Sequence, residues 1–165
     1  MRIHQYEKLW LAASFVLILA FITTITYGAV GLGITMIDDR EDAIDPTALS
    51  EHPKFGDPGV YETEDGDIEA YVIARQFIFQ PDPIVIPAGQ EVTFYITSPD
   101  VIHGFAVAGT NVNTMVIPGE VAVLTVQFDE PGEYGVLCNE YCGGGHHAME
   151  GMLHVVPPDE WEGDA

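Results

Sequence analysis

Basic side chains are scarce in this sequence. Only 5 Lys and Arg stand against 26 Asp and Glu in 165 residues, which gives a formal net charge of −21. Because proteins that bind nucleic acid neutralise phosphates with Lys and Arg, this composition excludes nucleic acid as a partner. The acidic residues are spread from Asp38 to Asp164, where 25 acidic and 3 basic side chains leave a charge of −22. This predicts a halophilic surface, in which salt screens the self-repulsion; the alternative is a docking patch for a basic protein.

Cysteine is equally rare, since Cys138 and Cys142 are the two in the chain. Their small number excludes a disulfide framework elsewhere in the chain. Both lie in one segment, CNEYCGGGHHAM from Cys138 to Met149. Thiolate, imidazole and thioether donors together favour copper, whereas zinc would leave Met149 without a role. A copper site with one Cys and two His would leave the second Cys unexplained, but two coppers sharing both thiolates would use it. A disulfide between the two cysteines remains the alternative.

A second histidine ligand is expected from the segment SPDVIHGF, in which His103 is the candidate. His147 is expected to face solvent or a partner, and His154 to be a structural residue. Met115 and Met152 are expected in the core.

The two segments, with FQPDP from Phe79 and PAG from Pro87, resemble subunit II of haem-copper terminal oxidases, in particular the B-type branch with one membrane helix. The resemblance covers most of residues 68–156 and the preceding helix. It implies a binuclear copper centre, CuA, in which Cys138 and Cys142 are bridging thiolates. His103 and Met149 complete one copper, and His146 and the backbone carbonyl of Glu140 complete the other. A Glu at this position also touches magnesium in two-helix relatives, so the resemblance leaves a magnesium ion at the subunit boundary open.

Residues 1–37 are predicted to form an N-terminal membrane anchor helix. Residues 9–37 carry no charge or His and would span roughly 44 Å as a helix, more than the hydrocarbon core of about 30 Å. A signal peptide cleaved near Ala29 is the rival, but its apolar region would be shorter. Arg2 and Lys8 precede the helix and Asp38 and Asp39 follow it, which predicts a cytoplasmic N-terminus, a single pass of the plasma membrane and an extracytoplasmic domain.

The remaining chain is predicted to be mainly β. Residues 38–66 form an acidic connector of irregular structure, 67–157 a folded domain, and 158–165 an acidic tail. Short apolar or alternating runs punctuated by Pro and Gly predict an antiparallel sandwich. They lie at 70–74, 84–86, 92–96, 122–128, 134–137 and 152–156. The resemblance narrows this to a cupredoxin-like Greek-key β-sandwich that follows one N-terminal transmembrane helix.

The expected function is electron transfer within a cytochrome c oxidase, as a non-catalytic subunit. An external donor, a cytochrome c or a small blue-copper protein, would reduce the two coppers, which pass electrons to haem in subunit I, where O2 is reduced. Phe77 is the candidate for the surface at which electrons enter, although alternation would equally bury Phe77 and Phe79 in the core. The alternatives are a membrane-anchored copper chaperone, a CuA domain like that of nitrous-oxide reductase, and a metal-free structural sandwich.

Overall fold

The computed structural model describes residues 4–27 and 43–163, which divide between two compact units, 1–40 and 41–165. In the first unit, α1 (Gln5–Thr26) begins with a capping box, in which the His4 N–H donates to the Glu7 carboxylate at 2.8 Å. Its 22 residues are long and apolar enough to cross a membrane. The helix starts four residues before the predicted run. The predicted residues 28–37, the cleavage position Ala29, and Arg2, Asp38 and Asp39 lie outside the described residues.

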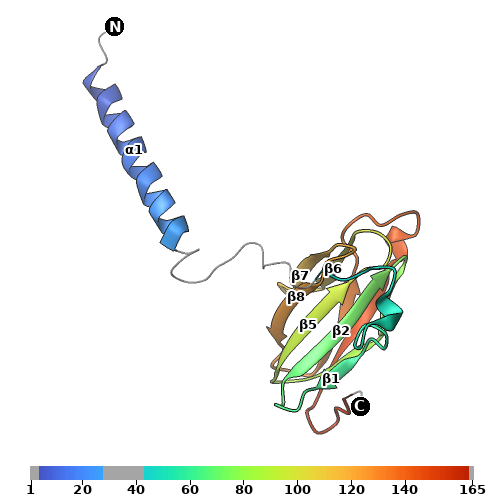
Figure 1. Cartoon of the computed structure of the whole chain (residues 1–165). Helices are drawn as coiled ribbons and strands as arrows, with labels where there is room; N and C mark the ends of the chain where they lie inside the picture. The colour runs from blue at the N-terminus through green and yellow to red at the C-terminus, as the bar shows by residue number, and fades with distance from the viewer. Residues whose placement is uncertain (1–3, 28–42, 164–165) are drawn as a thin grey trace. The chain divides into compact units, whose positions relative to one another are not determined.

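The second unit is a two-layer β-sandwich (Figure 1). Its first sheet has the order β1-β2-β5-β8, with β3 paired to β2, and its second has the order β4-β10-β9-β6-β7. The strands are β1 (Val60–Glu62), β2 (Ile68–Arg75), β3 (Ile78–Gln80), β4 (Ile84–Pro87), β5 (Glu91–Thr97), β6 (His103–Val107), β7 (Asn113–Val116), β8 (Ala122–Gln127), β9 (Gly132–Leu137) and β10 (Glu150–Val156). The mainly β prediction is confirmed. The sheets are mixed, not purely antiparallel, because β2 pairs with β5 and β4 with β10 in parallel.

Alternating burial shows why these runs form strands. In β5, every second residue from Val92 is buried, and in β10 the same alternation of buried and more exposed residues starts at Gly151. The inward residues of both sheets form one core around Phe94, Phe105, Ile86 and Leu153, all at most 1% exposed.

Strand direction brings distant segments to one end of the sandwich. Because β2 and β5 are parallel, the residues that follow them, Gln76 and Ser98, leave the sheet at the same end. β9 ends at Leu137 opposite Glu150, the first residue of β10, so the loop 138–149 closes between these two strands. The loop includes the 3-10 helix η3 (His146–Ala148) and lies at the opposite end of the unit from the C-terminal tail (Figure 1).

The segment before the predicted domain is partly ordered against it. It contains the 3-10 helix η2 (Leu49–Glu51) and β1, although irregular structure is expected there. Leu49 and Phe55 are buried with Ile73 in a second apolar cluster on the outer side of the first sheet. Phe55 meets Tyr71 edge-on at 5.3 Å between ring centroids. Residues 43–63 therefore belong physically to the β unit.

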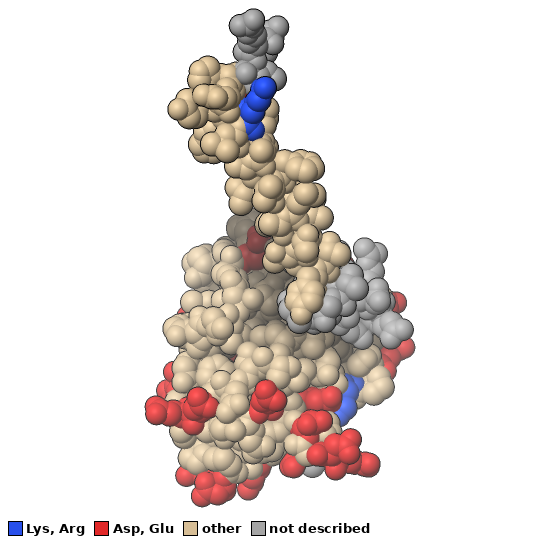
Figure 2. Space-filling model, turned by 90° about the vertical axis from the view of Figure 1, so that its left-hand side faces the viewer, with Lys and Arg blue, Asp and Glu red and all other residues tan. Residues whose placement is uncertain are grey.

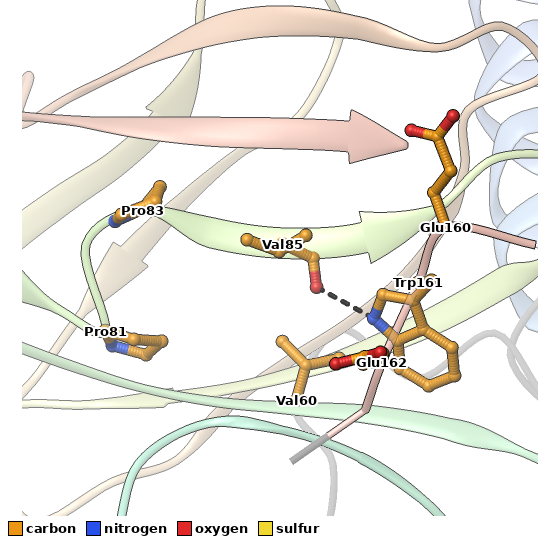
Figure 3. A pocket seen from close by; sticks show the side chains of 7 residues that line it. All are labelled: Val60, Pro81, Pro83, Val85, Glu160, Trp161 and Glu162. Atoms are coloured by element: carbon orange, nitrogen blue, oxygen red, sulfur yellow. Dashed lines mark hydrogen bonds between the residues drawn. The ribbon is translucent and has the colours of Figure 1, made fainter. Parts of the chain in front are cut away.

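The C-terminal tail also packs on the sandwich. The Trp161 indole Nε1–H donates to the Val85 carbonyl at 3.1 Å, and Val85 lies in β4 at an edge of the second sheet. Figure 3 shows the indole beside a cavity of about 330 Å³. Its lining consists of Val60, Pro81, Pro83, Val85, Glu160, Trp161 and Glu162. None of the predicted metal ligands contributes to this cavity.

On the visible face of the β unit, several separate groups of acidic side chains lie across the lower part and at the margins, with few basic ones among them (Figure 2). No single acidic block dominates this face. The distribution agrees with a generally acidic surface more than with one localised docking patch.

Candidate metal centre

Five soft or imidazole donors converge at the end of the sandwich where loop 138–149 closes. The Cys138 and Cys142 sulfurs are 3.7 Å apart, and the Cys142 sulfur is 3.6 Å from the Met149 sulfur. The His103 Nδ1 lies 3.8 Å from the Cys138 sulfur, and the His146 Nδ1 lies 3.7 Å from the Cys142 sulfur. The distance between the Cys138 and Cys142 sulfurs is much longer than the disulfide bond length of about 2.05 Å. The two cysteines therefore do not form a disulfide in this structure.

A backbone oxygen completes the group. The Glu140 carbonyl lies 3.2 Å from the Cys138 sulfur, whereas the Glu140 side chain is exposed and accepts the Tyr141 N–H at 3.2 Å. The backbone, not the carboxylate, therefore faces the cluster. All six predicted ligand residues are thus brought together, and His103, Cys138 and Cys142 alone already place their ligand atoms within 4.8 Å of one another.

Most side chains of the cluster are buried. His103 is fully buried, and Cys138, Cys142 and Met149 are at most 7% exposed, while His146 is half-buried. Desolvation by burial, followed by the hydrogen bond and charge of Cys138, raises the pKa of the metal-free Cys142 thiol to about 11. A metal cation that binds to the two cysteines must displace their thiol protons, because the thiolate is the form that ligates a metal.

The ring of His103 is oriented by Asp100. Its Nε2 lies 2.8 Å from the Asp100 Oδ1, which leaves Nδ1 turned toward Cys138. Partial burial raises the pKa of Asp100, but hydrogen bonds from the Gln76 N–H, from His103 and from neighbouring groups outweigh it, so this pKa lies below its ordinary value. A carboxylate on the far nitrogen of a ligating His fixes its tautomer and increases its donor strength.

Gly104 lets the ligand loop approach β6. A Cβ at Gly104 would lie 1.9 Å from the Asn139 Oδ1 and 2.9 Å from the backbone nitrogens of both Asn139 and Glu140. Asn139 in turn donates to Asn113 in β7 at 3.0 Å. Any side chain at position 104 would push away the peptide that carries the Glu140 carbonyl.

The turn between β2 and β3 covers the loop from the other side. Phe77 is half-buried, and a Cβ at Gly145 would lie 2.5 Å from its ring. Phe79 is 2% exposed and meets Phe105 edge-on in the core. The two phenylalanines therefore differ: Phe79 is a core residue, whereas Phe77 lies over the ligand loop.

The residues expected outside the site are also resolved. His147 is exposed, as predicted, and the half-buried His154 lies in β10 with its Nε2 4.0 Å from the Glu133 carboxylate. The prediction that Met115 and Met152 are core residues is wrong, since they are 53% and 37% exposed. Their strands present them on the outer face of the second sheet, which sequence alternation alone did not assign.

The sequence also gave no reason to single out Gln76 or Gly104, which contact the ligand loop directly.

A two-sheet β-sandwich with thiolate, imidazole and thioether donors at one end defines a cupredoxin-like domain. The family model for the periplasmic domain of cytochrome c oxidase subunit II matches residues 61–156. A cytochrome c oxidase subunit 2 of Thermus thermophilus is 43% identical over 153 residues, 91% of each chain. A second subunit 2 sequence from Thermus thermophilus is 47% identical over 116 residues, 69% of this chain and 86% of that protein.

Comparison with solved structures gives the same result as comparison of sequences. A chain of a heme-copper terminal oxidase dimer, determined by cryo-EM, has a TM-score of 0.61 at 36% identity and covers 92% of this chain and 99% of its own. The periplasmic domain of subunit II of the Bradyrhizobium japonicum cytochrome oxidase has a TM-score of 0.52 at 22% identity, over 56% of this chain and 86% of that one, and supports the fold alone. The chain belongs to the cytochrome c oxidase subunit II family, and is thus a subunit of a haem-copper oxidoreductase complex.

Proposed function

We propose that this chain is the electron-transfer subunit of a respiratory terminal oxidase, in which two copper ions held by loop 138–149 and His103 receive electrons from an external donor. The electrons then pass to haem in subunit I, where O2 is reduced to water. The observation that carries the proposal is the pair of unbonded thiols 3.7 Å apart, each with an imidazole nitrogen within 3.8 Å.

The donor set fits copper. Two thiolates, two imidazoles and one thioether are soft or borderline ligands, which copper prefers and hard cations do not. With both sulfurs central and one imidazole on each side, Cys138 and Cys142 would bridge two ions. His103 and Met149 would complete one ion, and His146 and the Glu140 carbonyl the other. Such a pair, when bound, supplies one-electron storage with the charge change shared between two ions.

The protein's own contribution is to hold these donors still. Cys138 is tied to Met149, since its N–H donates to the Met149 carbonyl at 3.2 Å at the end of the β9–β10 pair. His103 opens β6 and is anchored by its 2.8 Å contact with Asp100. Donors fixed in this way move little when the charge of a bound ion changes, and small rearrangement favours fast electron transfer. Their burial would keep water from bound ions.

Exposed apolar and aromatic residues adjoin the residues of the site in the sequence. Tyr141 in the ligand loop is 73% exposed, Ile78 48% and Ile102 43%, and the Phe77 ring lies over Gly145. We propose that electrons enter here, with Phe77 in the contact surface. At the salt concentrations of a halophile the screening length is about 3 Å or less, so short-range contact and not long-range attraction would position the donor, a cytochrome c or a small blue-copper protein.

Two further features belong to the same proposal. The exposed Glu140 carboxylate is available to a magnesium ion at the boundary with subunit I, but one carboxylate is a partial site, and the other ligands would come from water and the partner. The helix α1 would anchor the chain with the β unit outside the plasma membrane and the N-terminus in the cytoplasm.

Copper loading of the full chain in detergent tests the proposal. We expect two coppers per chain and a paramagnetic-resonance spectrum in which one unpaired electron couples to two copper nuclei. Cys142→Ser should abolish that coupling, whereas Met149→Leu should retain it and mainly change the reduction potential, because the thioether is the weaker donor. One copper per chain, coupled to a single nucleus, would contradict the binuclear assignment.

A further inference from the structure

The turn between β2 and β3 contacts both ligand-bearing segments although it supplies no ligand. On one side, the Gln76 backbone N–H donates to the Asp100 Oδ2 at 2.8 Å, and the other oxygen of the same carboxylate lies 2.8 Å from the His103 Nε2. A single carboxylate therefore connects this turn to the buried imidazole.

On the other side, the same residue reaches the cysteine loop. The Gln76 Nε2–H donates to the Cys142 carbonyl oxygen. Gly143, which follows, has a φ of +132° that L side chains rarely adopt, and a Cβ there would lie 2.7 Å from the Gln76 Nε2. The Phe77 ring then packs on Gly145. The glycines thus leave the space that the Gln76 amide and the Phe77 ring fill.

We propose that Gln76 is a positioning residue of the metal centre, which fixes the Cys142–His146 segment relative to Asp100 and His103. Cys142 and His146 have no strand pairing of their own, since they lie between the end of β9 and the start of β10. The amide of Gln76 anchors the backbone of this segment to the turn that also holds Asp100. The inference rests on the proposed function, because its consequence is the geometry of the two copper positions.

The first test needs no metal. In the metal-free full chain in detergent, Gln76→Met keeps the length of the side chain and removes the donor. Hydrogen–deuterium exchange of residues 142–148 should accelerate about fivefold, the factor that corresponds to one hydrogen bond of ordinary strength. Exchange in β9 and β10 should stay unchanged. The matched control is Gln90→Met, an exposed glutamine before β5, at the opposite end of that strand from Ser98.

The second test uses the copper-loaded chain. Gln76→Met should release copper to EDTA about five times faster than the wild type and make the coupling to the two copper nuclei less equal, with Gln90→Met at wild-type values. Gln76→Glu has nearly the same shape and places an acceptor against the Cys142 carbonyl. It should change both readouts in the same direction and more strongly, and it serves if the methionine variant does not fold.

The results separate the two proposals. Wild-type chain with one copper would overturn the binuclear function and leave the exchange test to decide the role of Gln76. Two coppers in the wild type, with exchange and copper release in Gln76→Met equal to those of Gln90→Met, would overturn the positioning role alone. Uniformly faster exchange through β9 and β10 would also overturn it, since that indicates general loss of stability.

Discussion

Gly104→Ala should damage the metal centre more than the fold. The added methyl would lie 2.9 Å from the backbone nitrogens of Asn139 and Glu140, whereas unstrained carbon contacts need about 3.5 Å, so this peptide must retreat by at least about 0.6 Å. The Asn139 side chain can rotate away from its 1.9 Å overlap, but only by giving up its hydrogen bond to Asn113. Overpacking of this kind costs about 1–3 kcal/mol in free energy of unfolding.

The assay compares thermal unfolding of the metal-free chain with the spectrum after copper loading. A loss of about 1–3 kcal/mol should lower the melting temperature of the β unit by about 4–12 °C. Because the Glu140 carbonyl moves with the displaced peptide, the coupling to one of the two copper nuclei should change. Gly144→Ala is the control, since a Cβ there meets nothing within 4 Å. If the two variants melt together and give the same spectrum, the close approach of β6 to the loop does not constrain the site.

Four more perturbations follow from the structure. Because burial raises the pKa of the metal-free Cys142 thiol from 9.0 to about 11, the folded state holds this proton more tightly, and the stability of the metal-free chain should fall as pH rises from about 9 to about 11; a flat profile in urea titrations would refute this. Withdrawal of salt from molar to about 10 mM, where the screening length is about 30 Å, should lower the melting temperature, and an unchanged value would refute the halophilic reading. Trp161→Phe removes the hydrogen bond to Val85 and should cost about 1 kcal/mol without changing the copper spectrum; equal melting of variant and wild type would show that the tail contributes nothing. Phe77→Leu keeps an apolar group on the loop glycines but removes the ring, so stopped-flow reduction by the native donor should slow while two coppers remain bound, and an unaltered rate would place the point of electron entrance elsewhere.

Most of the candidate ligands could be proposed from sequence because their chemistry is local. Five of the six candidate ligand residues fall within twelve positions, and the residue types of Cys, His and Met among them restrict the metal before any fold is known. The strands that carry this segment, β9 and β10, were equally visible as short apolar runs on either side of it. His103 was a candidate from its place in SPDVIHGF, but the resemblance was needed to pair it with Met149 and to choose the Glu140 backbone carbonyl, because nothing local connects His103 to a loop 35 residues further on.

The supporting contacts could not be predicted in this way. Gln76 and Gly104 matter because β2 and β5 are parallel and β6 pairs with β7 and β9, which are properties of register between distant strands. The ordered part of the connector was missed for a related reason. Leu49 and Phe55 are isolated apolar residues in a Pro- and Asp-rich stretch, and the surface that they cover is formed by residues of the folded sheet such as Ile73, Tyr71 and Tyr95.

The six donors divide into two groups by what holds them. Cys138 and Met149 are linked by a backbone hydrogen bond at the end of the β9–β10 pair, and His103 belongs to β6, so these three inherit their positions from the sheet. Glu140, Cys142 and His146 lie between the strands, where support comes from Gln76, from the Asn139–Asn113 hydrogen bond and from the turn bonds of η3. Substitutions in the strands that hold the first group should therefore change the stability of the sandwich and metal binding together. Substitutions around the second should mainly change the ion that we propose His146 and the Glu140 carbonyl would hold, with a smaller effect on the sandwich, because these three residues lie outside the strand pairs.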